Sequence, residues 1–295
     1  MRIRATVAAV TGALALSALA VPVAQADDST YRGTAAAAFE AAHSGVSKAQ
    51  RSTAAAVVDG DLDASFSNFK IASSHKVGTT NQVSTKVTYK LTHGADVDLG
   101  SADFATGPYI YKGSFATPDN VIFGFDAATC TEASATVANC TGYVDILPSE
   151  GELLNSDAGS WKGGALLLNY VTGSYADQGD LATTKVLRNS RLTVNASPEP
   201  VKKGKTITVT GALTRANWET NKYAGYTQQS VKLQFKKKGT STYTDVKTVK
   251  SGTGSSAGKL KTTVTASVDG TFRYAFAGTS TTPAVNSAGD AIDVQ

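Results

Sequence analysis

Apolar and polar residues alternate along several short segments in the C-terminal part of the chain. Residues 206–213 read TITVTGAL, where Ile207, Val209 and Leu213 alternate with threonine or small residues. A period of two with β-branched partners is typical of a strand with one buried face. The pattern recurs at 192–196, 231–235, 243–249, 260–266, 272–276 and 291–294. About seven short strands separated by turn signals predict an immunoglobulin-like β-sandwich over residues 190–295.

Residues 65–189 show a noisier version of the same pattern. Val83, Thr85, Val87, Tyr89 and Leu91 alternate with polar residues. Further strands are predicted at 109–112, 121–125, 143–147, 161–170 and 183–187. These segments predict a second β-sandwich, joined to the first without a Gly/Ser-rich or Pro-rich linker. The predicted fold class is all-β, with two immunoglobulin-like sandwiches in tandem.

An Ala-rich arm, residues 27–64, precedes the predicted strands. Ala35, Phe39, Ala42 and Val46 recur at helical intervals, although Gly45 interrupts them. Alanine favours the helix, but a helix this short is marginal in water without a packing surface. The pattern therefore predicts a frayed helix or a disordered arm.

Residues 1–26 have the three-part pattern of a secretory signal peptide. Arg2 and Arg4 precede an apolar run, and an A-x-A motif ends at Ala26, which predicts cleavage before Asp27. No later stretch approaches the roughly 20 apolar residues needed to span a bilayer. We therefore expect a secreted, extracellular protein with no membrane span.

Charge is distributed unevenly along the chain, whose formal net charge is only +4. Residues 27–189 contain 11 Lys and Arg against 18 Asp and Glu. Residues 190–295 contain 15 Lys and Arg against 6 Asp and Glu. The two predicted sandwiches therefore carry net charges of opposite sign.

Some cations of the basic part are predicted to point away from the apolar faces of their strands. The candidate basic surface consists of Lys232, Lys236, Lys237, Lys238, Lys261 and Arg273. Such a surface attracts anionic cell-wall polymers or acidic polysaccharide through summed potential, with nucleic acid the less favoured partner. The alternative is that outward lysines serve solubility and blunt the edges of sheets.

The two cysteines, Cys130 and Cys140, lie in the segment CTEASATVANC. In an exported protein this spacing predicts a disulfide that pins the base of a hairpin or loop and stabilises the fold by roughly 2–3 kcal/mol. A metal pair is the alternative. It is disfavoured because no His or further Cys lies close by to complete a tetrahedral set.

Acidic residues in predicted loops are candidate calcium ligands. The segment 59–63, DGDLD, resembles the start of an EF-hand loop, but the sixth and twelfth positions are Ala64 and Lys70 instead of Gly and Glu. Looser loop carboxylates remain candidates for calcium, with solvated acidic loops as the alternative. These candidates are Asp96, Asp98 and Asp103, or Asp177 and Asp180.

A catalytic constellation is not evident. Of the three histidines, His43 falls in the arm, His75 in a predicted turn, and His93 at the end of a predicted strand, where an exposed loop histidine is the simplest interpretation. Residues 254–258, GSSAG, match G-x-S-x-G, but no histidine follows them and no α/β sheet is predicted. A carboxylate pair for glycoside hydrolysis cannot be identified from the sequence.

Several longer segments resemble a group of small secreted actinobacterial proteins. They are RLTVNASPEPVKKGKTITVTGALTRANW, YAGYTQQSVKLQFKKKG and FRYAFAGTSTTPAV, together with NSDAGSW, the CT…C spacing and the leader MRIRATVAAVTGALALSALA. The resemblance implies a signal peptide and tandem immunoglobulin-like sandwiches, and it carries over no assigned function. Some members of the group are labelled calcium-binding.

The sequence thus predicts a secreted, non-catalytic β-sandwich protein that acts as a binding or structural module at the cell envelope or in the medium. Two alternatives are a calcium-binding extracellular protein and a carbohydrate-active enzyme.

Overall fold

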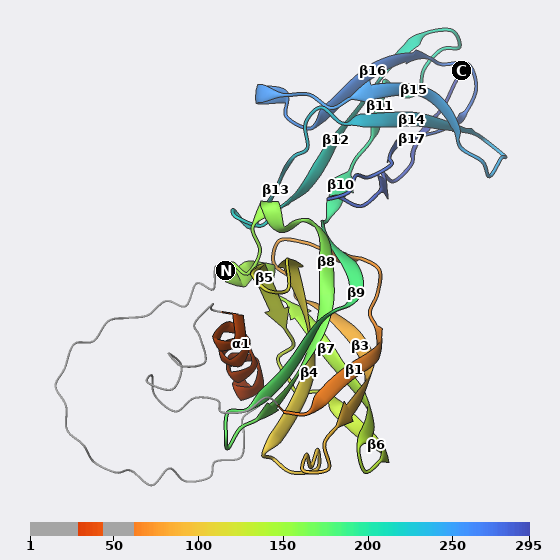
Figure 1. The fold of residues 1–295 in the computed structure, drawn as a ribbon. Coiled ribbons are helices and arrows are strands. Elements are labelled where there is room, and N and C mark those ends of the chain that lie inside the picture. The colour runs from red at the N-terminus through yellow and green to blue at the C-terminus, as the bar shows by residue number, and fades with distance from the viewer. Residues whose placement is uncertain (1–28, 44–61) are drawn as a thin grey trace. The chain divides into compact units, whose positions relative to one another are not determined.

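The computed structural model describes residues 29–43 and 62–295. The predicted signal peptide with its Ala26–Asp27 junction and residues 44–61 lie outside the described residues. The chain folds into two compact units (Figure 1). Of the described residues, the first unit takes in 29–43, 62–75, 82–147 and 160–184, and the second takes in 76–81, 148–159 and 185–295.

Two sheets form the first unit. Their strands are β1 (Ala64–Lys70), β2 (His75–Val77), β3 (Val83–His93), β4 (Phe104–Gly113), β5 (Pro118–Phe123), β6 (Thr129–Ser134), β7 (Val137–Ile146), β8 (Gly159–Asn169) and β9 (Tyr175–Arg188). One sheet has the order β1-β3-β7-β6, and the other has the order β2-β9-β8-β4-β5. The ends of β2, β8 and β9 are counted in the second unit.

This strand order is that of an immunoglobulin fold. In the nomenclature of that fold, β1, β3, β7 and β6 take the places of strands A, B, E and D, and β9, β8, β4 and β5 take those of G, F, C and C′. The buried Val87, Leu91 and Val144 of one sheet and Ile110 and Leu167 of the other are core residues. The all-β prediction for this part of the chain is confirmed.

The second unit repeats the architecture with shorter strands. They are β10 (Ser190–Leu192), β11 (Asn195–Ser197), β12 (Thr206–Asn217), β13 (Lys222–Gly225), β14 (Ser230–Lys237), β15 (Thr244–Lys250), β16 (Lys259–Thr265), β17 (Gly270–Phe276), β18 (Val285–Asn286) and β19 (Asp290–Ile292). One sheet centres on β12, which pairs with β10, β11, β13 and β16; in the other, β14 lies between β15 and β17, and β17 also pairs with β18 and β19. Strands β11, β12 and β16 correspond to A, B and E, and β15, β14, β17 and β19 to C′, C, F and G.

The core of the second unit joins these two sheets. Ile207 and Val209 of β12 belong to the same buried cluster as Leu233 of β14 and Phe272 and Tyr274 of β17. The Tyr274 hydroxyl donates to the Val209 carbonyl across the core at 3.0 Å. The period-two apolar positions of the sequence are therefore the inward positions of a sandwich.

Helix α1 (Ser29–His43) packs on the outer face of the first unit's second sheet, beside β4 and β5 in Figure 1. Tyr31, Ala35 and Phe39, spaced four residues apart, are buried. They contact a cluster formed by Ala105, Tyr109, Tyr111, Phe123, Leu166, Leu168 and Tyr175. The helix that was one of the two predictions for this arm is present over residues 29–43, but it is packed instead of frayed, because the sheet supplies the packing surface that an isolated helix lacks.

The other described helical segments are single 3-10 turns. They are η1 (Pro148–Glu150), η2 (Asn155–Asp157) and η3 (Gly254–Ser256). Among the described residues, no helix has the length and apolar character to cross a bilayer.

Candidate functional site

Five of the six residues of the candidate basic surface lie on β14 and its neighbours. Val231 and Leu233 of β14 point into the core, so Lys232 and Lys236 point outward, and Arg273 lies beside them on β17. Lys237 and Lys238 follow at the exposed end of β14. Lys261, by contrast, lies on β16 in the opposite sheet. The expectation of one surface with all six residues is wrong for Lys261, because strand order cannot be read from alternation.

Several of these cations have partners on the same surface. The Lys232 ammonium lies 2.5 Å from Asp245, and that of Lys238 lies 3.0 Å from Asp269. Hydrogen bonding to Asp269 raises the pKa of Lys238, and hydrogen bonding from Lys232 lowers the pKa of Asp245. Because these side chains are exposed, such pairs contribute little to stability. They do reduce the charge that Lys232 and Lys238 present to a ligand.

The ring of Tyr243 contacts two other cations of this surface. The guanidinium of Arg273 lies 3.8 Å from the centre of the Tyr243 ring, and the Lys236 ammonium lies 5.2 Å from it. Arg273 Nε also donates to Gln234 Oε1 at 2.8 Å. No ion pair to Lys236, Lys237 or Arg273 occurs in the described part of the chain. These three residues therefore carry most of the available charge.

A second group of arginines and tyrosines lies around β12. The Arg191 guanidinium stacks 3.6 Å from the Tyr223 ring centre, and that of Arg215 lies 3.9 Å from the Tyr226 ring centre. Trp218 is buried, and its indole N–H donates to the Gly78 carbonyl at 2.9 Å. These aromatic side chains are therefore poorly placed to stack on a sugar ring, because the indole is buried and a guanidinium occupies one face of each tyrosine ring.

Three of the candidate calcium carboxylates contact three different partners. Asp98 accepts from the Gly100 amide at 2.9 Å, Asp177 contacts His43 Nε2 at 2.8 Å, and Asp180 lies 2.5 Å from the Lys162 ammonium. The hydrogen bond from Lys162 lowers the pKa of Asp180. Asp96 and Asp103 lie between β3 and β4. Within residues 29–43 and 62–295, no group of three or more His, Cys, Asp or Glu side chains is arranged to hold a metal ion.

The histidines lie in three separate environments. His75 is buried between Thr85 and Thr184, and His43 contacts Asp177 at the end of α1. His93 is only 4% exposed, and its Nδ1 lies 2.9 Å from the Gly94 carbonyl. The expectations of a turn for His75 and an exposed loop for His93 are wrong, because each side chain points into the sandwich. No histidine shares a site with another.

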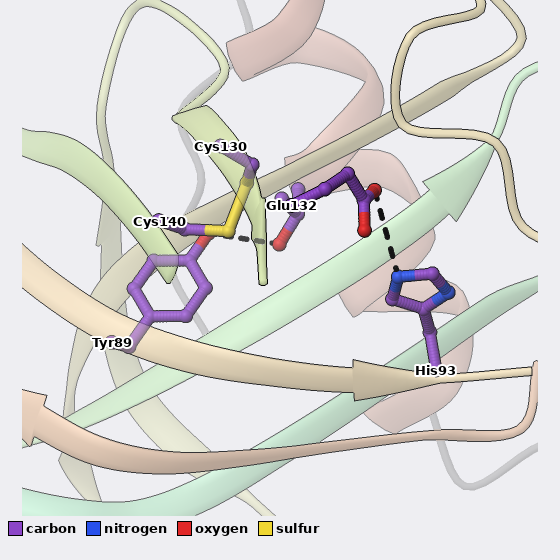
Figure 2. The surroundings of a disulfide bond; sticks show 6 residues. Tyr89, His93, Cys130, Glu132 and Cys140 are labelled. Atoms are coloured by element: carbon purple, nitrogen blue, oxygen red, sulfur yellow. Dashed lines mark hydrogen bonds and ion pairs between the residues drawn. A yellow bond between two sulfur atoms is a disulfide. The ribbon is translucent and has the colours of Figure 1, made fainter. Parts of the chain in front are cut away.

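The disulfide between Cys130 and Cys140 is present, as predicted. The two cysteines are directly opposite partners on β6 and β7. The bond therefore pins a hairpin within one sheet, whereas the disulfide of antibody domains joins strands B and F of opposite sheets. Figure 2 shows Glu132 of the same hairpin directed toward His93, whose Nε2 lies 3.9 Å from the carboxylate.

Comparison with known proteins identifies no family for this chain. No protein-family model and no curated protein matches the chain. The similar solved structures include a marsupial T cell receptor, at 13% identity and a TM-score of 0.31 over 79% of this chain and 73% of that one. They also include the fibronectin(III)-like modules of CbhA from Clostridium thermocellum, at 10% identity and a TM-score of 0.25 over 77% of this chain and 92% of that one.

A third similar structure is dimeric latent PorU from Porphyromonas gingivalis, with 11% identity and a TM-score of 0.28. The alignment covers 78% of this chain and 20% of PorU. Because all three TM-scores are low, the fold assignment rests on the strand order of the two units.

Proposed function

We propose that this protein is a secreted binding module that attaches, without catalysis, to anionic polymers of the cell envelope. Attachment takes place through its basic C-terminal sandwich. An immunoglobulin-like fold presents large sheet faces and suits a binding or structural role, while function itself depends on the residues those faces carry.

The observation that carries the proposal is the segregation of charge along the chain. Residues 190–295 hold 15 of the chain's Lys and Arg against 6 Asp and Glu. Lys236, Lys237 and Arg273 concentrate part of that charge around β14 and β17 without carboxylate partners among the described residues. A polyanion with repeated charges gains attraction from such a surface even where no single contact is strong.

Adsorption of the purified protein to isolated cell walls tests this proposal. We expect binding at low salt that weakens steeply as ionic strength rises, because the Debye length falls from about 30 Å at 0.01 M to about 8 Å at 0.15 M. The double variant Lys236→Gln/Lys237→Gln should weaken adsorption about fivefold, or about 1 kcal/mol.

A matched control removes the same charge elsewhere. Lys86 and Lys90 lie on the outward face of β3 in the acidic part of the chain. Lys86→Gln/Lys90→Gln should leave adsorption within about twofold of wild type. Equal losses of adsorption in the two double variants, or adsorption that does not change with ionic strength, would refute the proposal. So would a polysaccharide hydrolase activity that disappears when one carboxylate is replaced.

A further inference from the structure

Two guanidinium groups without an acidic partner lie close together in the second unit. Arg188, at the end of β9, is only 8% exposed, and its Nε donates to the carbonyl of Ala216 at 2.6 Å. Ala216 follows Arg215 in β12, and the charge of Arg215 acts on Arg188. In the described part of the chain, neither arginine forms an ion pair.

This arrangement costs free energy in the absence of an anion. Burial lowers the pKa of Arg188 to about 10, and the neighbouring charge of Arg215 acts in the same direction. Arg188 therefore remains charged at neutral pH. Glu219 acts on it in the opposite sense, but forms no ion pair with it and accepts a hydrogen bond from the Asn155 amide at 3.2 Å. Buried charges in proteins are ordinarily paired, whereas neither arginine has a carboxylate partner within residues 29–43 and 62–295.

The surroundings of Arg215 hold its guanidinium in a fixed orientation. One face of the group lies 3.9 Å from the centre of the Tyr226 ring, and Nη1 donates to the buried Thr282 Oγ1 at 3.3 Å. The Tyr226 hydroxyl lies 3.5 Å from Oγ1 of the exposed Thr279. Arg215 itself is partly exposed. Its remaining N–H groups are thus available beside a hydroxyl side chain and near the buried charge of Arg188.

We propose that Arg215 binds an oxyanion, a carboxylate or phosphate group, with the neighbouring Arg188 strengthening the attraction and Thr279 supplying a further hydrogen bond. The planar fork of a guanidinium matches such groups in geometry as well as charge. The inference rests on the proposed function, because it identifies the group of the envelope polymer that the second unit recognises. Bound oxyanion relieves the repulsion between the two arginines.

Calorimetric titration of the full chain tests the site, with oligogalacturonate as the carboxylate probe and a glycerol phosphate polymer as the phosphate probe. We expect Arg215→Gln to weaken binding of the recognised probe by about tenfold or more. The preferred probe identifies the source of the oxyanion. Arg188→Lys, which keeps the charge but loses the fork, should weaken binding by a smaller factor without unfolding the sandwich.

Arg191→Gln is the matched control. Arg191 also stacks on a tyrosine beside β12, at 3.6 Å from the Tyr223 ring centre, and its substitution removes the same charge from the same sheet. Because β10 places Arg191 opposite Thr214, it lies on the other face of β12 from Arg215. We expect this variant to bind within about twofold of wild type.

The outcomes separate the site from the proposed function. Equal losses in Arg191→Gln and Arg215→Gln, or no binding of either probe by wild type, overturn the site. Wall adsorption can survive that result, since the surface around β14 is distinct. Conversely, the protein can bind a probe through Arg215 and yet fail to adsorb to walls. That result supports the site and refutes the proposed function.

Discussion

His75 is held in one neutral form by two threonines. The Thr184 hydroxyl donates to the Ala72 carbonyl at 2.7 Å, so its oxygen accepts from His75 Nε2–H at 2.9 Å. Nδ1 then accepts from the Thr85 hydroxyl at 2.8 Å. Both nitrogens of the neutral ring are satisfied, and burial lowers the pKa of the imidazole. A proton on Nδ1 would break this arrangement.

The protein should therefore lose stability in mild acid. The folded-state pKa of His75 lies below the value of about 6.5 for an unfolded chain, so the unfolded chain binds the proton more tightly. This contribution is complete above about pH 6.5 and declines as the pH falls through that value. Urea unfolding at a series of pH values should show the decline, and His75→Gln should reduce it.

The other buried histidine provides the comparison. His93→Gln leaves the contacts of His75 with Thr85 and Thr184 intact. The unfolding free energy of this variant should therefore keep the pH dependence that His75 contributes. A His75→Gln profile that parallels wild type would contradict this account.

Phe39 is the most deeply buried aromatic residue of helix α1. Phe39 is fully buried, and its ring lies 5.0 Å from that of Tyr109 and 5.8 Å from that of Phe123. Beneath the helix, the hydroxyls of Tyr31 and Tyr109 are buried without a hydrogen-bond partner among the described residues. Apolar burial must therefore supply most of the docking free energy, and it must also offset these unpaired hydroxyls.

Phe39→Ala should release the helix. We expect a loss of about 3 kcal/mol in the unfolding free energy of the first unit, since the aromatic side chain leaves a cavity. Limited proteolysis should also cut within residues 29–43 more quickly than in wild type. Ala37→Ser, at an exposed position of the same helix, should change neither quantity measurably. Unchanged proteolysis of Phe39→Ala would show that the helix is held by other contacts.

The disulfide secures an edge strand. Among the strands that the structure describes, β6 pairs with β7 alone, and most of its residues are exposed. Cys130→Ala/Cys140→Ala should lower the unfolding free energy by about 2–3 kcal/mol. Hydrogen exchange should quicken at the amides of β6, while those of β3 remain protected. Uniform acceleration across both strands would mean that the bond stabilises the whole sheet.

The alternation of apolar and polar residues predicted the strands that have one solvent-exposed face, such as β3 and β12. Strand β6, TCTEAS, was missed because an edge strand exposed on both sides has no apolar period. The docking of α1 was missed because its partners lie from Ala105 to Tyr175 in the sequence. The Arg188–Arg215 pair was missed for the same reason, since the pairing of Ser190, just after Arg188, with Arg215 of β12 brings together residues far apart in the sequence.

At the scale of the whole molecule, the segregated charge has a consequence for solution behaviour. Residues 27–189 and 190–295 carry net charges of opposite sign. Copies of the protein should therefore attract one another at about 0.01 M salt and cease to do so near 0.15 M, where screening is strong. Light scattering across a salt series measures this, and scattering that does not vary with salt would contradict it.

The position of α1 ahead of the described strands of the first unit also sets an order of events during synthesis. Residues 29–43 leave the ribosome before the strands of the first unit, yet the sheet that covers their apolar side is complete only when β9 has been made, up to Arg188. Although domains generally fold in order from the N-terminus, this helix therefore cannot dock before the strands that follow it have been made. Its docking has to be a late step in the maturation of the first unit, however early its residues appear.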